Sequence, residues 1–147
     1  MWWVLAGVVL VTLYIFSHID DWGRDLTTNF ARTDAESDDL RPARIALPME
    51  PAAELVRRAA GKLPGWELAE PQPQPLDDGS QEWHFVRTTR LMRYKDDVHV
   101  RLEPTADGSG VIAHIRSRSR IGKGDLGQNP RNIRELLARI EAESTGS

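Results

Sequence analysis

Apolar and polar residues alternate along the second half of the chain, and a period of two predicts β-strands. The alternation is clearest over residues 97–102, where every second side chain is apolar. The same period runs through residues 81–90 and 110–118, and a short stretch at 66–68 adds a fourth candidate. We therefore expect four strands, three of them with one apolar and one polar face.

Two other stretches have the period of an amphipathic helix. The first opens at Pro51 and ends near Gly61, and the second runs from Ile133 to Ile140. The order helix, four strands, helix predicts an α+β domain. We expect a mostly antiparallel four-stranded sheet with two helices on one face, because this arrangement buries every apolar stripe.

The first residues of the chain are predominantly apolar and add one element to this prediction. No acidic residue, lysine or arginine interrupts Trp2–Ile19, and aromatic residues lie towards both ends. Such a run predicts one transmembrane helix, with the lipid bilayer as its partner. A cleaved signal peptide fits less well because no small-residue cleavage site follows, and a buried helix is a further alternative. We expect a single-pass membrane protein of the cell envelope, with its globular part on the non-cytoplasmic side.

The rest of the chain falls into segments of different composition. Residues 20–46 are polar and acidic without an apolar period, so we expect a linker between the membrane anchor of residues 1–19 and a domain at 47–143. Residues 144–147 read as a disordered tail. The net charge of −3 hides a basic block, because residues 84–134 carry 11 bases against 5 acids. That block either neutralises the acidic part of the fold or attracts an anion.

The candidate chemistry lies in the basic block. Arg116, Arg118 and Arg120 alternate with serines, so in a strand all three point to one face. A glycine-rich loop follows and leads into the last helix, where backbone N–H groups favour anions. The alternatives are a structural ion-pair network and an anion or ligand site. The loop lacks the spacing of a phosphate-binding Walker motif.

Two consecutive acids, Asp96 and Asp97, stand at the start of the strand expected over residues 97–102. Neighbours in a strand point to opposite faces, so a salt bridge from one of them to an arginine is favoured over joint metal binding. His99 and His114 share the polar face with Asp97, but their spacing is weak for a metal site. We expect no metal and no cofactor, and too few aromatic residues interleave with the bases to suggest nucleic-acid binding.

A block of motifs gives a family resemblance. The Asp-Asp-Val sequence at 96–98 and the run Arg-Ser-Arg-Ser-Arg-Ile-Gly from residue 116, with its continuation to Ile133, resemble the domain of unknown function 1499 family over roughly residues 45–140. The matching positions are Asp96, Asp97, Arg116, Ser117, Ser119, Arg120, Gly122, Asp125, Gly127, Asn129 and Arg131. Members often carry an N-terminal export or membrane segment. The family has no established activity, so the resemblance implies no catalytic role.

We expect a non-catalytic binding or interaction module whose partner is an anionic ligand or an envelope protein. The candidate ligand-binding residues are Asp96, Asp97, Arg116, Arg118, Arg120, Asp125, Asn129 and Arg131. The alternative is an enzyme acting on an anionic substrate, with Asp96 or Asp97 as general base and Arg116 and Arg120 stabilising charge.

Overall fold

The computed structural model describes residues 2–17 and 28–146. Its helices are α1 (Trp2–Phe16), α3 (Met49–Gly61) and α4 (Gln128–Thr145). Its strands are β1 (Phe30–Arg32), β2 (Ala43–Ile45), β3 (Trp66–Leu68), β4 (Gln74–Pro75), β5 (Gln81–Thr88), β6 (Lys95–Pro104) and β7 (Val111–Ser119).

All the described strands form one antiparallel sheet with the order β1-β7-β6-β5-β3. The short strands β2 and β4 pair with β7 and β5 respectively. The predicted four-stranded sheet is therefore wrong, because the described sheet has seven strands. The additional three are two or three residues long and are held by backbone pairing rather than by an apolar period.

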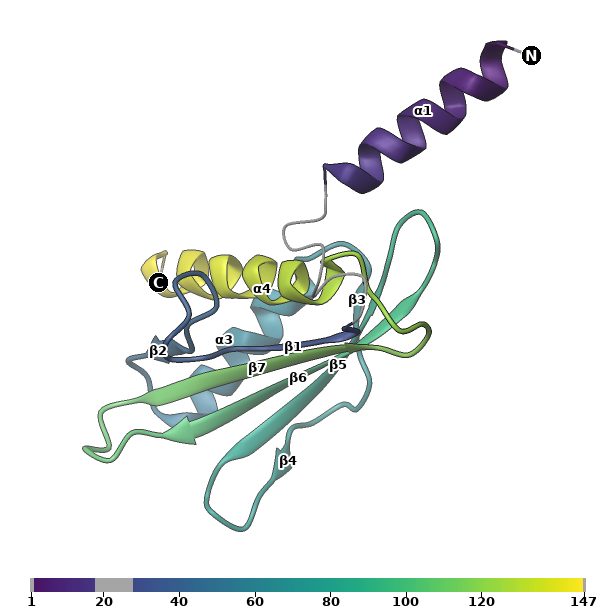
Figure 1. Ribbon diagram of the computed structural model, residues 1–147. Coiled ribbons are helices and arrows are strands. Elements are labelled where there is room, and N and C mark those ends of the chain that lie inside the picture. Colours follow the sequence, from purple (N-terminus) through teal and green to yellow (C-terminus); the bar gives the residue numbers. More distant parts are fainter. Residues whose placement is uncertain (1, 18–27, 147) are drawn as a thin grey trace.

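The segment assigned to a linker contributes two of these strands. β1 and β2 follow one another along the same edge of β7, β1 pairing with its C-terminal end and β2 with its N-terminal end (Figure 1). Ile45 of β2 is buried in the core. The folded part therefore begins well before residue 47, and α4 continues through Thr145 into the stretch expected as a disordered tail.

The helices α3 and α4 pack on the same face of the sheet (Figure 1). The alternating apolar residues of β5, β6 and β7 point into this inner face, and the apolar stripes of both helices cover them. The indole Nε1 of Trp83 donates to the carbonyl of Ala53 at 3.1 Å and ties β5 to α3. The most deeply buried side chains include Leu55, Val56, Phe85, Val98, Val100, Leu102, Ile115, Ile133, Leu136 and Ile140.

The prediction of a transmembrane helix is also wrong. Within residues 2–17 and 28–146, no helix combines the length and the apolar character needed to cross a membrane. α1 has 15 residues, so it is about 22 Å long at 1.5 Å per residue, against about 30 Å for the hydrocarbon core. Residues 18 and 19 of the predicted span lie outside the described residues. The single-pass topology and the envelope location that depended on this span are accordingly not supported.

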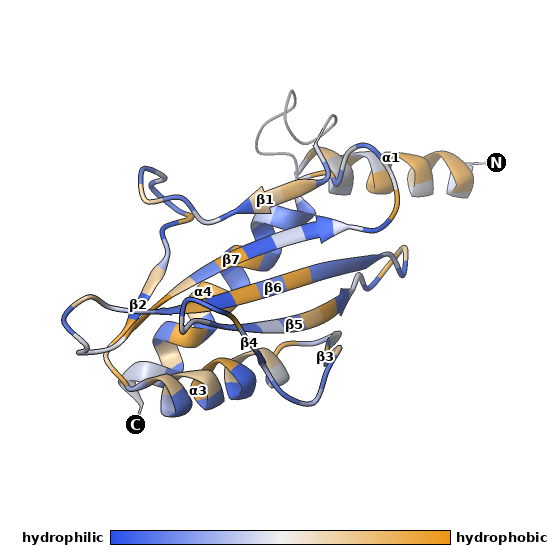
Figure 2. Ribbon diagram, turned by 90° about the horizontal axis from the view of Figure 1, so that it is seen from below, coloured by the Kyte–Doolittle hydropathy of each residue, from blue (hydrophilic) through white to orange (hydrophobic). Residues whose placement is uncertain are grey.

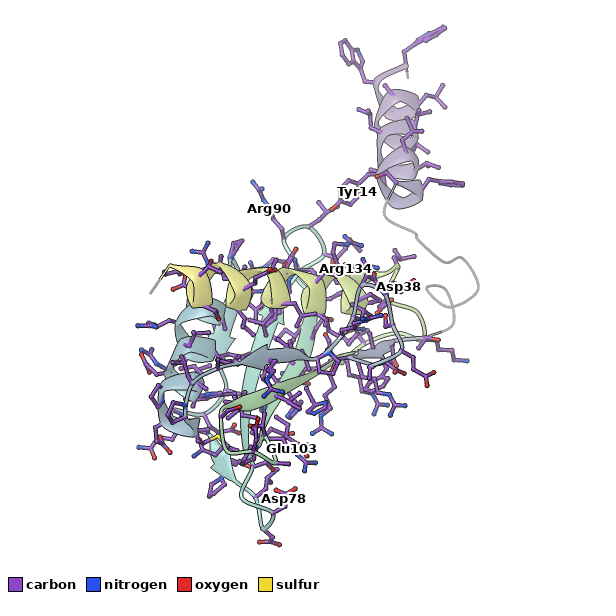
Figure 3. All side chains as sticks on the ribbon, turned by 90° about the vertical axis from the view of Figure 1, so that its left-hand side faces the viewer. Tyr14, Asp38, Asp78, Arg90, Glu103 and Arg134 are labelled. Atoms are coloured by element: carbon purple, nitrogen blue, oxygen red, sulfur yellow. The ribbon has the colours of Figure 1, made fainter. Side chains whose placement is uncertain are left out.

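The sheet has a second, outer face that no described helix covers. Figure 2 views the sheet from this side and shows polar and apolar residues alternating along β5, β6 and β7. In Figure 3, Glu103 of β6 lies on the side of the sheet away from Arg134 of α4. The polar side chains of β5, β6 and β7 therefore lie together on one surface that no described helix covers.

Candidate functional site

Cross-strand register brings distant residues together on the outer face, because directly paired residues of an antiparallel sheet point to the same side. Two rows run across β5, β6, β7 and β1: His84, His99, Arg116 and Arg32 form one, and Val86, Asp97, Arg118 and Phe30 form the next. These two rows therefore cross four strands, one of which comes from the segment expected to be a linker.

Asp97 lies on this face and is held by three short side-chain contacts. Arg120 donates to both of its carboxylate oxygens, at 2.8 and 2.7 Å, and His84 Nε2 lies 2.8 Å from Oδ1. The hydrogen bonds from Arg120, aided by the contact with His84, lower the pKa of Asp97 to about 2. Asp97 is therefore a carboxylate at neutral pH with both oxygens occupied, which makes it a poor general base.

Two histidines cross-link this ion pair to a second one. The imidazole rings of His84 and His99 are stacked, with centroids 4.3 Å apart and planes within 7° of parallel. His99 Nδ1 lies 3.1 Å from Glu82 Oε1, and the same carboxylate accepts from Arg116 at 3.1 and 3.3 Å. Burial lowers the pKa of His99, and the positive charges nearby act in the same direction.

Two arginines of the outer face remain without a partner. Among the described residues, neither Arg118 nor Arg32 has a hydrogen bond or an ion pair with another side chain. They lie on opposite sides of Arg116: Arg118 follows it by two residues on β7, and Arg32 is its cross-strand partner on β1. An unpaired guanidinium keeps all five of its N–H donors available to a ligand or to water.

Part of the outer face is hollowed. A hollow of about 710 Å³, which we call the arginine hollow, is lined by Phe30, His84, Asp97, His99, Arg116, Arg118 and Arg120 among others. Its charged lining consists of three arginines and one aspartate, so it is positive. A neighbouring hollow of about 540 Å³ includes three arginines and three carboxylates in its lining and is balanced. An anion would therefore bind more favourably in the arginine hollow than in the neighbouring hollow.

Asp96 lies on the other side of the sheet, in a group that we call the buried polar cluster. Its members are Asp96, Ser117, Ser119, Asn129 and Asn132, and all of them are buried. Asp96 accepts from Ser119 Oγ at 2.7 Å and from Asn132 Nδ2 at 2.9 Å. No lysine, arginine or histidine of the described chain lies within ion-pair distance of it. Because helix and sheet cover it, Asp96 cannot meet a ligand of the outer face.

Asn129 and Asn132 attach α4 to this cluster. Asn129 accepts from Ser117 Oγ at 2.6 Å and donates to Ser119 Oγ at 3.0 Å and to the carbonyl of Asn29 at 2.9 Å. Asn132 also donates to Ser117 Oγ at 3.0 Å. The helix N-terminus is thus joined to β7 and to the segment before β1, which indicates a structural role for Asn129.

The glycine-rich loop does not offer an anion cradle. Asp125 accepts from the backbone N–H groups of Gly127 and Asn129, both at 2.9 Å, so its carboxylate already occupies the first turn of α4. Arg131 Nη2 donates to the carbonyl of Leu126 at 3.2 Å within the same turn. These two candidate residues therefore stabilise the start of the helix.

The structure thus divides the predicted site into three parts. It brings together Asp97, Arg116, Arg118 and Arg120 in the arginine hollow and places Asp96 and Asn129 in the buried polar cluster. Asp125, in the loop before α4, and Arg131, in the first turn of α4, lie apart from both. Sequence reasoning missed Phe30 and Arg32, because their strand was not expected, and Glu82 and His84, because only the register relates them to β7. Within the described chain no three residues are grouped so as to hold a metal ion.

Comparison with known proteins adds the family. A family model described as "Protein of unknown function (DUF1499)" matches residues 24–140. The chain belongs to the DUF1499 family. The match includes β1 and β2, so the DUF1499 domain starts earlier than the motifs alone indicated. No curated protein and no solved structure matches the chain.

Proposed function

We propose that this DUF1499 domain is a non-catalytic binding module that holds an anionic ligand in the arginine hollow. The observation that carries the proposal is Arg118, which lines the hollow and has no partner among the described residues. Guanidinium groups bind carboxylate and phosphate oxygens through pairs of parallel hydrogen bonds. A free arginine in a positive hollow therefore favours an oxyanion over a neutral or cationic ligand.

The two other arginines of the hollow are held in place by carboxylates. Arg116 uses Nη2 for Glu82, and Arg120 uses Nε and Nη2 for Asp97. Each guanidinium therefore keeps further N–H donors for a ligand. Side chains that are already fixed lose less conformational entropy when a ligand binds, which increases the affinity that the contacts provide.

The same contacts argue against the enzyme alternative built on Asp96, Asp97, Arg116 and Arg120. A general base needs a pKa near the working pH and access to the substrate. The pKa of Asp97 is about 2 and both of its oxygens are bonded. Asp96 is only 1% exposed and faces α4. Binding without proton transfer is the function that this geometry supports best.

Titration of the isotopically labelled full-length protein with sodium phosphate, followed by amide chemical shifts at constant ionic strength, tests the proposal. We expect saturable shifts at Asp97, His99 and Arg118. Arg118→Gln should weaken this binding roughly tenfold or more, as loss of a charge-assisted contact worth about 1.5–3 kcal/mol implies.

The matched control is Arg58→Gln, which removes the same charge from the exposed side of α3. It should leave the phosphate titration unchanged. Shifts that never saturate, or an equal loss of binding in both variants, would show that the protein responds only to its overall charge, and the proposal would be abandoned.

A further inference from the structure

Aromatic rings share the arginine hollow with the cations. Phe30 is the cross-strand partner of Arg118, so the two side chains leave the sheet on the same face at neighbouring positions, and both line the arginine hollow. The residue is 39% exposed, and the ring makes no contact with another aromatic ring in the part of the chain that the structure describes. An exposed phenyl group in a hollow offers apolar area that a small inorganic anion cannot cover.

The stacked imidazoles lie next to this pair in the register. His99 neighbours Arg116, and His84 continues the same row on β5. Their parallel rings form a planar element in the lining of the hollow, and their side chains retain 23% and 27% exposure. The lining therefore combines three guanidinium groups with three planar rings, Phe30, His84 and His99.

We infer that the natural ligand carries its oxyanion directly on an aromatic ring, as an aryl phosphate or an aryl carboxylate does. The inference rests on the proposed function and specifies the chemical class of its ligand. The oxyanion binds Arg118, and the attached ring packs against Phe30, which lies directly across from Arg118. Because the two side chains are neighbours in the sheet, a ligand with ring and anion directly joined meets both at once.

Three ligands of the same anionic class separate the contributions: inorganic phosphate, methyl phosphate and phenyl phosphate. We expect phenyl phosphate to bind roughly three- to tenfold more tightly than methyl phosphate, in line with the energy of an aromatic pair. Methyl phosphate should bind about as well as inorganic phosphate, because neither has a ring. Chemical-shift titration of the full-length protein measures all three affinities under one condition.

Phe30→Leu is the decisive variant because it keeps an apolar side chain in β1 while removing the ring. It should abolish the preference, so that phenyl phosphate and methyl phosphate bind to the variant with equal affinity. The variant Phe30→Tyr retains the ring and should retain the preference, which separates loss of the ring from disturbance of the strand.

Each outcome has a definite meaning. Equal affinity for phenyl and methyl phosphate overturns the aromatic inference and leaves the binding proposal standing. A phenyl preference that survives in Phe30→Leu also overturns it, because the ring would then bind elsewhere. Failure of all three phosphates to bind overturns the proposed function itself.

Discussion

The inner and outer faces of the sheet use their polar residues differently, and Asp96 and Asp97 show the difference at adjacent positions. Asp96 is buried under α4, where only neutral groups, Ser119 and Asn132, donate to it. Asp97 faces outward with its side chain 27% exposed, and its partners are Arg120 and His84. One face uses polar groups to attach a helix, whereas the other keeps charged groups within reach of solvent.

The comparison shows that two consecutive acids in a strand belong to two different sites, one on each face of the sheet. Successive side chains of a strand point to opposite faces, so each acid takes the chemistry of its own side. Asp96 stabilises the fold, because in the buried interior no water can replace it as the hydrogen-bond acceptor of Ser119 and Asn132. The outer acid contributes to the position and charge of the arginines around it.

The largest expected effect comes from Asp96→Ala. It leaves the Ser119 hydroxyl and the Asn132 amide without their buried acceptor, which should cost about 3–4 kcal/mol of unfolding free energy. Urea denaturation measures the loss. The matched variant Asp97→Ala removes the neighbouring acid and should cost at most about 2 kcal/mol, because water can solvate what remains. A larger loss for Asp97→Ala would contradict the division between the two faces.

A smaller effect should appear in the pH dependence of stability. In the folded chain the pKa of Asp97 is about 2, below its ordinary value of 3.8. The stabilisation from its ion pair is therefore complete above about pH 4 and lost as the pH falls towards 2. Allowing for partial exposure, the loss should be about 1–2 kcal/mol.

Denaturation midpoints of the natural chain and of Asp97→Asn, measured between pH 5 and pH 2, give this contribution as the difference in slope. The variant lacks the titrating group, so its curve should be flatter over this range. Parallel curves would mean that the outer ion pair adds nothing to stability.

The smallest expected effect is that of Arg120→Ala. Read from sequence alone, this arginine could have neutralised a buried carboxylate, at a cost of about 3–5 kcal/mol when removed. In the structure its side chain is 45% exposed and its partner Asp97 keeps the contact with His84. We therefore expect a loss of about 1 kcal/mol or less, measured by thermal unfolding against Arg90→Ala in the exposed hairpin between β5 and β6. If the Arg120→Ala variant unfolds, Arg120 belongs to a buried structural ion-pair network, and its description as an exposed partner of Asp97 is wrong.

The strands with a clear period of two could be predicted because burial on one face leaves a regular pattern in the sequence. Val98, Val100 and Leu102 are all buried, as their alternation with polar residues predicts. β1 and β2 were not predicted, because a strand of three residues is too short to show a period of two. Backbone pairing with β7 holds them regardless of side-chain polarity. Short strands of this kind depend on the completed sheet.

The candidate site was predictable only in part for a related reason. The direction of Arg116 and Arg118 follows from alternation within β7, and Arg120 continues this alternation one residue beyond the end of the strand. The contacts of His84 with Asp97 and of Glu82 with Arg116 depend on the register between strands, which no local pattern contains. Asn132 was overlooked because an uncharged polar residue in an amphipathic helix resembles a surface position, although it shares the face of Leu136.

The pairing of β1 and β2 with β7 has a practical consequence for dissecting the protein. Together they cover the free edge of a strand nine residues long. A fragment beginning at residue 47 would keep both helices and most of the core but would expose that row of backbone donors and acceptors. Uncovered edges recruit strands from other molecules, so such a fragment should self-associate. The short N-terminal strands therefore also act as protection against aggregation.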